Sequence, residues 1–289
     1  MKQAPVTGWR ERKRKRERNA RIVAFTALAL GAIIFAAPFV FMLLTSFKSL
    51  AQADKMSPLE WPHPFVWSNY ADALAQMNFW LDLRNTCIIV YACMVGTLIS
   101  SSIVAYGFAR LNFPGKNVWF GLMLATMMLP TVATQLPLYD LYKRLGWVNT
   151  FYPLTLPAFF GSAYNTFLLR QFFMTLPSEL EDAARIDGCS TFGIFYRVFL
   201  PLSKPALMTV GIFTFMFSWN NLFGPLIYLR TPDKYTLSVG LAQFNGLYST
   251  QYGLLMAASI VIVMPLLVLF FVAQKHFVKG IVLSGLGGR

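Results

Sequence analysis

The residue types that most often carry out catalysis are sparse in this chain and form no familiar catalytic or metal-binding pattern. Its two histidines, His63 and His276, lie far apart, and its cysteines do not show the spacing of a disulfide framework. Cys87 and Cys93 are six residues apart, so on one helix they project from different faces, and Cys189 is remote from both. The chain also has no GxxxxGK[ST] sequence, the phosphate-binding loop of many ATPases. We therefore expect no metal site, no cofactor and no enzymatic activity of its own.

The composition indicates a membrane protein. The chain is 56% hydrophobic and only 13% charged, whereas soluble domains carry about 25% charged residues. Six apolar runs are long enough to cross a bilayer as helices, which is the structure that satisfies the backbone within lipid. They are Ile22–Phe47, Thr86–Ala109, Val118–Leu138, Phe151–Phe173, Ala206–Leu229 and Gly253–Gln274. The sequence thus predicts an all-α polytopic membrane protein with six transmembrane helices.

The distribution of positive charge predicts the orientation of these helices. With the N-terminus inside, the cytoplasmic segments hold 18 of the 25 Lys and Arg residues and the outer segments hold 7, as the positive-inside rule expects. Nine of the 18 lie in the first 21 residues, where they favour anionic lipid over nucleic acid because no second basic face or aromatic platform accompanies them. The first apolar run is too long for a cleaved signal peptide. We expect a basic cytoplasmic segment at 1–21, a six-helix domain at 22–274 and a cytoplasmic tail at 275–289.

Polar residues inside the apolar runs are candidates for a transport pathway. Asn220 and Asn221 lie in the fifth run beside Gly224-Pro225, which can break a helix and expose backbone groups. Gln135 lies between two prolines in the third run. For Asn220 and Asn221, a hydrogen bond to a helix of the partner subunit is an equally good interpretation. The six runs contain no Asp or Glu, which argues against a proton-coupled carrier.

The segment 174–204, between the fourth and fifth runs, is polar yet patterned as ordered structure. Ser178 can cap a helix, and acidic residues fill the first turn, where the helix dipole favours them. That helix is predicted to stop at Gly188, and a second helical stretch to end at Leu200-Pro201. Two short helices that protrude between membrane spans suggest a docking site for a cytoplasmic protein.

The same segment resembles the EAA loop of bacterial ABC importer membrane subunits, whose pattern is EAA-x3-G-x9-I-x-LP. In this chain the order is Asp182-Ala183-Ala184, three residues, Gly188, nine residues, and Val198-x-Leu200-Pro201. Asp182 replaces the glutamate, with Glu181 beside it, and Val198 replaces the isoleucine. The resemblance implies a type I ABC importer permease fold and a loop that couples to an ATPase through Glu181, Asp182, Ala183, Ala184, Gly188, Leu200 and Pro201.

Other stretches extend the resemblance over nearly the whole chain after Arg21. Trp219-Asn220-Asn221 and the residues after it are similar to the WNEF-x-x-PL stretch of carbohydrate permease subunits, with Asn221 in place of the glutamate. The layout resembles the second permease subunit of maltose-type importers. In that family the loop between the last two spans contacts a binding protein, which implies this role for Gln243, Asn245 and Tyr248. A similar C-terminal tail reaches the ATPase interface there, although a frayed terminus is an equal alternative here.

The resemblance implies a permease subunit of an ATP-driven, binding-protein-dependent importer in the bacterial cytoplasmic (inner) membrane. The substrate implied is a carbohydrate, either an oligosaccharide, a simple sugar or a related polyol. The implied partners are a second permease subunit, a cytoplasmic ABC ATPase dimer, a periplasmic or lipid-anchored binding protein and membrane lipid, with no nucleic acid. The alternatives are a stand-alone secondary transporter, a membrane scaffold or receptor, and an ABC permease for a non-sugar solute such as a glycerophosphate.

Overall fold

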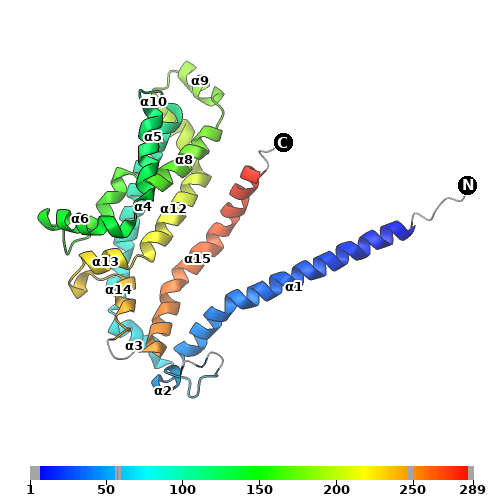
Figure 1. Ribbon diagram of the computed structural model, residues 1–289, viewed down its shortest axis with the longest axis vertical. Coiled ribbons are helices and arrows are strands. Elements are labelled where there is room, and N and C mark those ends of the chain that lie inside the picture. Colours follow the sequence, from blue (N-terminus) through cyan, green and yellow to red (C-terminus); the bar gives the residue numbers. More distant parts are fainter. Residues whose placement is uncertain (1–6, 56, 58–59, 247–249, 286–289) are drawn as a thin grey trace, which may run out of the picture. The chain divides into compact units, whose positions relative to one another are not determined.

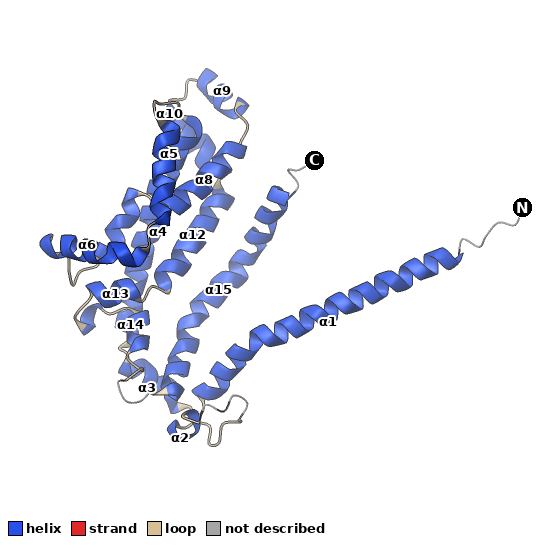
Figure 2. Cartoon of the chain, viewed as in Figure 1, coloured by secondary structure: helices blue, strands red, loops and turns tan. Residues whose placement is uncertain are grey.

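The computed structural model describes residues 7–55, 57, 60–246 and 250–285. These residues form helices and connecting loops without a β-strand, except for an isolated antiparallel bridge between Asn245 and Thr250 (Figure 2). The predicted all-α class is therefore confirmed. The chain divides into two compact units, one formed by residues up to Ala73 with Phe244–Val261 and the other by Leu74–Gln243 with residues from Ile262 onward.

The first unit contains α1 (Thr7–Ser46), α2 (Leu50–Ala53), most of α3 (Ser68–Gln76) and the beginning of α15 (Tyr252–Gly285). The apolar side chains of α1 are almost all exposed, as Phe25 (73%) and Phe35 (79%) show. The segment after α1 is held in place by Asn69, whose Nδ2 donates to the carbonyls of Ser46 (2.8 Å) and Lys48 (2.9 Å). An apolar helix with so little buried surface is suited to lipid or to partner helices rather than to water.

The second unit is built around α4 (Phe79–Arg110), which packs against α8 (Ala163–Thr175), α12 (Lys204–Trp219) and the short helix η2 (Leu156–Phe160) (Figure 1). Its remaining elements are α5 (Lys116–Ala125), η1 (Thr126–Met128), α6 (Thr131–Arg144), α7 (Tyr152–Thr155), α9 (Glu179–Ile186), α10 (Thr191–Ile194), η3 (Phe195–Phe199), α11 (Leu200–Leu202), α13 (Phe223–Tyr228), η4 (Pro232–Lys234) and α14 (Leu237–Ala242).

Small residues allow the neighbours of α4 to approach closely. A Cβ added to Gly96 would lie 2.7 Å from the ring of Phe159 in η2. Ser101 is fully buried, and Ser100 donates from Oγ to the carbonyl of Ala158 at 2.8 Å. Small side chains are typical of close helix packing in membranes. The stretch from Gly96 to Ser102 therefore serves as a packing surface.

Three helices in the described part of the chain are each long and apolar enough to span a membrane. They are Arg14–Ser46, Phe79–Arg110 and Tyr252–Val272, and two bent helix pairs raise the number to five if each pair is one span. The third, fourth and fifth predicted runs are not single helices. The third bends after η1, the fourth is divided into α7, η2 and α8 at Gly161-Ser162, and the fifth is interrupted between α12 and α13.

The helix that contains the second predicted run is longer than the run itself. The helix α4 begins at Phe79, earlier than the hydropathy of the run indicated, and so includes Asp82. This side chain is 2% exposed and lies against α14, where a Cβ on Gly240 would clash with its Oδ2. Likewise α15 continues through the predicted tail as far as Gly285.

Candidate functional site

The segment resembling the EAA loop folds as two helical pieces joined at a glycine. The helix α9 ends where Gly188 adopts φ +78°, a conformation that favours glycine. The prediction that Ser178 caps α9 is wrong, because its backbone is α-helical (φ −68°, ψ −27°) and its side chain accepts no capping bond. The second piece begins at Ser190, whose Oγ accepts from the N–H of Gly193 at 3.2 Å. The predicted helix–glycine–helix arrangement is thus confirmed.

A cluster of aromatic rings packs the loop against α4 and α8. Tyr106 of α4 places its ring centroid 5.2 Å from that of Phe195 and 5.0 Å from that of Phe199. Phe173 of α8 stacks edge-on against Phe199 at 5.7 Å. Phe199 is 1% exposed and Phe173 fully buried. Buried aromatic pairs stabilise by about 0.5–1.5 kcal/mol each beyond the area they bury, so the loop is packed onto α4 and α8 as an ordered element.

Arg110, at the end of α4, fixes the end of α8 that leads into the loop. One of its guanidinium nitrogens donates to the carbonyls of Phe173 (2.6 Å) and Leu176. The guanidinium carbon lies 4.9 Å from the ring centroid of Phe199. Carbonyls in the last turn of a helix lack intrahelical donors, and an arginine can supply them. The same residue therefore caps α8 and contacts the aromatic cluster.

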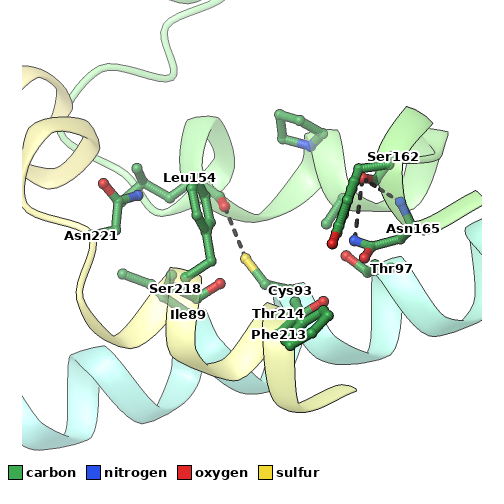
Figure 3. A pocket seen from close by; sticks show the side chains of 14 residues that line it. Ile89, Cys93, Thr97, Leu154, Ser162, Asn165, Phe213, Thr214, Ser218 and Asn221 are labelled. Carbon is green, nitrogen blue, oxygen red and sulfur yellow. Dashed lines mark hydrogen bonds between the residues drawn. The ribbon is translucent and has the colours of Figure 1, made fainter. Parts of the chain in front are cut away.

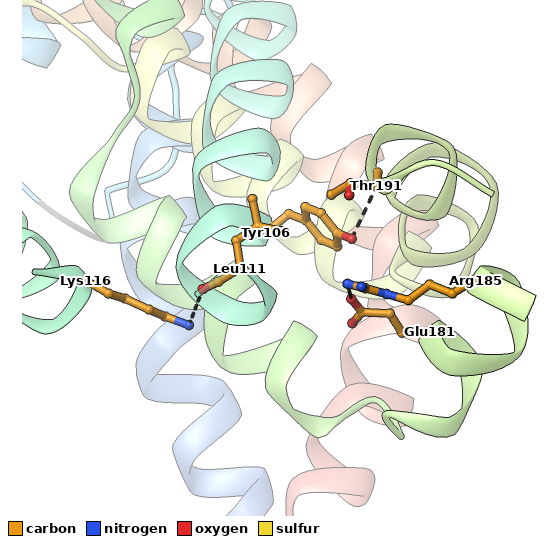
Figure 4. A network of polar contacts seen from close by, with 6 residues as sticks. All are labelled: Tyr106, Leu111, Lys116, Glu181, Arg185 and Thr191. Carbon is orange, nitrogen blue, oxygen red and sulfur yellow. Dashed lines mark hydrogen bonds and ion pairs between the residues drawn. The ribbon is translucent and has the colours of Figure 1, made fainter. Parts of the chain in front are cut away.

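The residues of the motif divide into buried and exposed members. Glu181 is 7% exposed and accepts a hydrogen bond from Arg185 at 2.8 Å, which raises the pKa of that guanidinium (Figure 4). Ala184 is buried in the core beneath the loop, whereas Asp182 and Ala183 are exposed. Leu200 is half-buried and Pro201 exposed.

Large apolar side chains remain exposed on the outer surface of the same loop. Ile186 is 87%, Phe192 69% and Tyr196 65% exposed in the single chain. Exposed apolar groups of this size on a polar loop are typical of a protein–protein contact. Together with Asp182 and Ala183 they form what we call the loop surface.

A cavity of about 470 Å³ lies in the second unit, between α4, the α7–α8 region and α12 (Figure 3). Of the predicted pathway residues, Asn221 lines it, and Asn220 and Gln135 do not. Its other polar lining includes Thr97, Ser162, Asn165, Thr214 and Ser218. Thr97 lies on α4, Ser162 and Asn165 lie at the start of α8, and Thr214 and Ser218 lie on α12. No pattern in the sequence indicates that these three groups lie close together.

The two neighbouring asparagines already make local hydrogen bonds. Asn221 accepts at Oδ1 from the N–H of Gly224 (3.1 Å), which satisfies the start of α13. Asn220 donates from Nδ2 to the carbonyl of Met216 (2.8 Å) in its own helix and is exposed. The break between α12 and α13 therefore lies at Asn220–Leu222, just before the Gly224-Pro225 pair.

The segment before the last helix is tied to the beginning of α4. Asn85 donates from Nδ2 to the carbonyls of Asp233 (3.0 Å) and Tyr235 (2.9 Å). Beyond α14, Gln243 and Asn245 are exposed. Tyr248, the third predicted contact residue, lies outside the described residues.

Comparison with known proteins defines the class of this molecule. A family model described as a binding-protein-dependent transport system inner membrane component matches residues 96–282. The chain belongs to this family of inner membrane transport components, which confirms the resemblance inferred from the loop motif.

Individual relatives match along almost the whole chain. The arabinooligosaccharides transport system permease protein AraQ of Halalkalibacterium halodurans is 33% identical over 92% of this chain and 95% of the relative. The lactose transport system permease protein LacG of Rhizobium radiobacter is 30% identical over 92% of this chain and 96% of the relative. A chain in the crystal structure of a bacterial ABC transporter involved in alginate import superposes with a TM-score of 0.78, at 23% identity, over 96% of this chain and all of that chain. The chain therefore shares that fold.

Proposed function

We propose that this protein is a permease subunit that imports a carbohydrate across the bacterial inner membrane with energy supplied by a separate ATPase. The observation that carries the proposal is the loop at 174–204, which is packed on α4 and α8 while its motif residues Asp182 and Ala183 face outward. The names of the relatives AraQ and LacG support a sugar as the substrate.

In this proposal the chain has the type I importer topology. Six spans cross the membrane, with the divided run Phe151–Phe173 as the fourth, and both termini are cytoplasmic. Residues 1–21 form the basic cytoplasmic segment, 22–274 the transmembrane domain and 275–289 the cytoplasmic end, which in α15 is helical as far as Gly285. The asymmetry of Lys and Arg supports this orientation.

The coupling residues have two kinds of role. Glu181, Ala184 and Leu200 are buried or half-buried and hold the loop in shape, and Gly188 sets the turn. Asp182, Ala183 and Pro201 are exposed and contact the ATPase together with the apolar side chains of the loop surface. Closure of the ATPase dimer on ATP then moves the loop and the spans attached to it, which switches access from one side to the other.

The remaining predicted sites complete the assembly. A second permease subunit pairs with this one, and Asn221, with Asn220 and Gln135 as weaker candidates, contributes to the pathway. Gln243, Asn245 and Tyr248 contact a periplasmic or lipid-anchored binding protein. The folded loop at 174–204 disfavours a stand-alone secondary transporter, because such a carrier has no ATPase to which the loop could couple.

Co-purification tests the proposal. The tagged chain in mild detergent should recover a P-loop ATPase and a second permease, and Gly188→Val should lose the ATPase and keep the permease. Valine at φ +78° costs about 1–3 kcal/mol of backbone strain, although the space around the position is open. Gly146→Val is the matched control, since Gly146 also has an open surrounding and φ +71° but lies outside the loop; it should retain both partners.

Recovery of the unmodified chain without any ATPase, combined with sugar uptake that needs no ATP, would overturn the proposal. Equal loss of the ATPase in both glycine variants would show that backbone strain in general, and not the loop, controls the association.

A further inference from the structure

We infer that the cavity between α4, the α7–α8 region and α12 is a binding site for an uncharged polyhydroxylated solute, one or two sugar rings in size, held by this subunit itself. The inference rests on the proposed function and adds to it the location and the charge of the ligand. A volume of about 470 Å³ lies within the range of about 300–1,000 Å³ that is typical of small-molecule sites.

Two of the residues that line this cavity each carry a buried polar atom without a hydrogen-bond partner. Thr214 is 7% exposed, and its Oγ1 is buried without a hydrogen bond. Asn165 donates from Nδ2 to Ser162 Oγ (3.2 Å), but its Oδ1 is also buried and unpaired. Buried polar groups are nearly always hydrogen-bonded, so these two atoms indicate a hydrogen-bonding ligand (Figure 3).

Two of the helix interruptions in the second unit border this cavity. Ser162 precedes α8, a helix of 13 residues, and Asn221 lies in the break between α12 and α13. Interrupted helices within a membrane leave backbone groups unpaired and are tolerated where they line a cavity. In transporters such breaks occur at substrate sites. The residues at the two breaks and the residues with unpaired atoms therefore line the same cavity.

The lining also indicates the chemistry of the ligand. It combines hydroxyl and amide groups with the aromatic residues Tyr164, Phe213 and Phe217. Hydroxyl and amide groups can both donate to and accept from sugar hydroxyls, and aromatic rings provide apolar faces for the C–H groups of a sugar ring. The described lining residues include no Asp, Glu, Lys, Arg or His. An anionic solute such as a glycerophosphate would find no counter-charge there, so the cavity favours a neutral sugar.

Cys93 provides a direct test because it lies in the cavity lining, where its Sγ donates to the carbonyl of Leu154 at 3.1 Å. Cys87→Ser and Cys189→Ser would leave Cys93 as the reactive thiol of this subunit. The complete transporter in liposomes is first assayed for ATP-dependent uptake of lactose, arabinobiose and diacetylchitobiose. The rate of modification of Cys93 by a small methanethiosulfonate is then measured with binding protein and ATP, with and without the transported sugar.

The transported sugar should slow the modification of Cys93 by about tenfold when it is present at ten times its dissociation constant for the site. Thr214→Val should weaken this protection, because it removes one hydrogen-bonding group without changing the size of the side chain. Thr209→Val on the same helix is the matched control, since its hydroxyl is already bonded to the carbonyl of Pro205 at 3.0 Å outside the cavity; it should leave the protection intact.

Uptake of a sugar with no protection of Cys93, or a Cys93 that does not react at all without sugar, would overturn the inference and leave the proposed function standing. Equal protection in Thr214→Val and Thr209→Val would overturn the assigned role of Thr214. Failure to take up any of the three sugars would instead contradict the carbohydrate assignment of the proposed function, and the inference would fail with it.

Discussion

At the scale of single residues, the two neighbouring acids of the loop motif have different surroundings. Glu181 turns inward and is bonded to Arg185, whereas Asp182 is exposed one residue later. Side chains on consecutive helical positions point about 100° apart, which places one on the core side and the next on the solvent side. The loop motif alone identifies both residues and cannot assign these separate roles.

Reversing the charge of the exposed acid should therefore weaken partner binding without unfolding the loop. Asp182→Lys is expected to lower the affinity for the ATPase by about tenfold or more, because like charges facing each other at an interface cost several kcal/mol. The measurements are recovery of the ATPase and protease cleavage within 174–204. Glu60→Lys, an equal charge change at an exposed residue of the first unit, is the control.

Glu181→Ala, in contrast to Asp182→Lys, should destabilise the folded loop itself. It leaves Arg185 without its bonded carboxylate and opens space beneath α9, so the loop should become more sensitive to protease. If Glu181→Ala lost ATPase binding while its loop stayed fully resistant to protease, Glu181 would act at the ATPase contact. That result would contradict its assignment to the structure of the loop.

At the scale of elements, α4 connects several features of the second unit. Its first turns bind the segment at 233–237 through Asn85 and Thr86. Its last turns carry Tyr106 and Arg110, which contact the loop at 174–204 and the end of α8. In its middle, Gly96 allows η2 to approach. The close packing of this one helix therefore positions both the cavity and the loop.

Adding a methyl group in the middle of α4 should disturb this packing. Gly96→Ala places a Cβ 2.7 Å from Phe159 and is expected to destabilise the protein by about 1–3 kcal/mol through overpacking. Gly107→Ala in the same helix meets nothing within 4 Å and should be neutral or stabilising by up to about 1 kcal/mol. Thermal unfolding in detergent measures both, and equal melting temperatures would show that Phe159 moves aside at no cost.

The sequence predicted the elements better than their interruptions. Hydropathy identifies the long apolar runs because lipid requires them, and the loop motif identifies the residues proposed to couple to the ATPase. The break at Gly161-Ser162 was not predicted, because it depends on Gly161 at φ +95° and on the packing of η2 against α4. The inclusion of Asp82 in α4 was also missed, since its burial depends on Gly240, which is remote in sequence.

The residues of the cavity could not be grouped into one site from the sequence either. Its unpaired atoms belong to Asn165 and Thr214, which lie on different helices and are ordinary residues in the sequence. Asn221 was identified because it is a polar residue within an apolar run, beside Gly224-Pro225. Only the packing of α8 and α12 on α4 brings these residues together.

At the scale of the whole molecule, much of the apolar surface is left uncovered by the single chain. Phe25 and Phe35 of α1 and Leu136 of α6 are each more than 70% exposed. Lipid and partner helices must cover such surfaces. The family, the exposed surfaces and the packed loop together agree with one subunit of a larger importer.

The most direct test of the central claim is sugar uptake by the complete transporter in liposomes, with ATP supplied inside and binding protein outside. The account predicts uptake that requires both ATP and the binding protein and that is lost in Gly188→Val but retained in Gly146→Val. Uptake by this chain alone, driven by an ion gradient and unaffected by Gly188→Val, would contradict it.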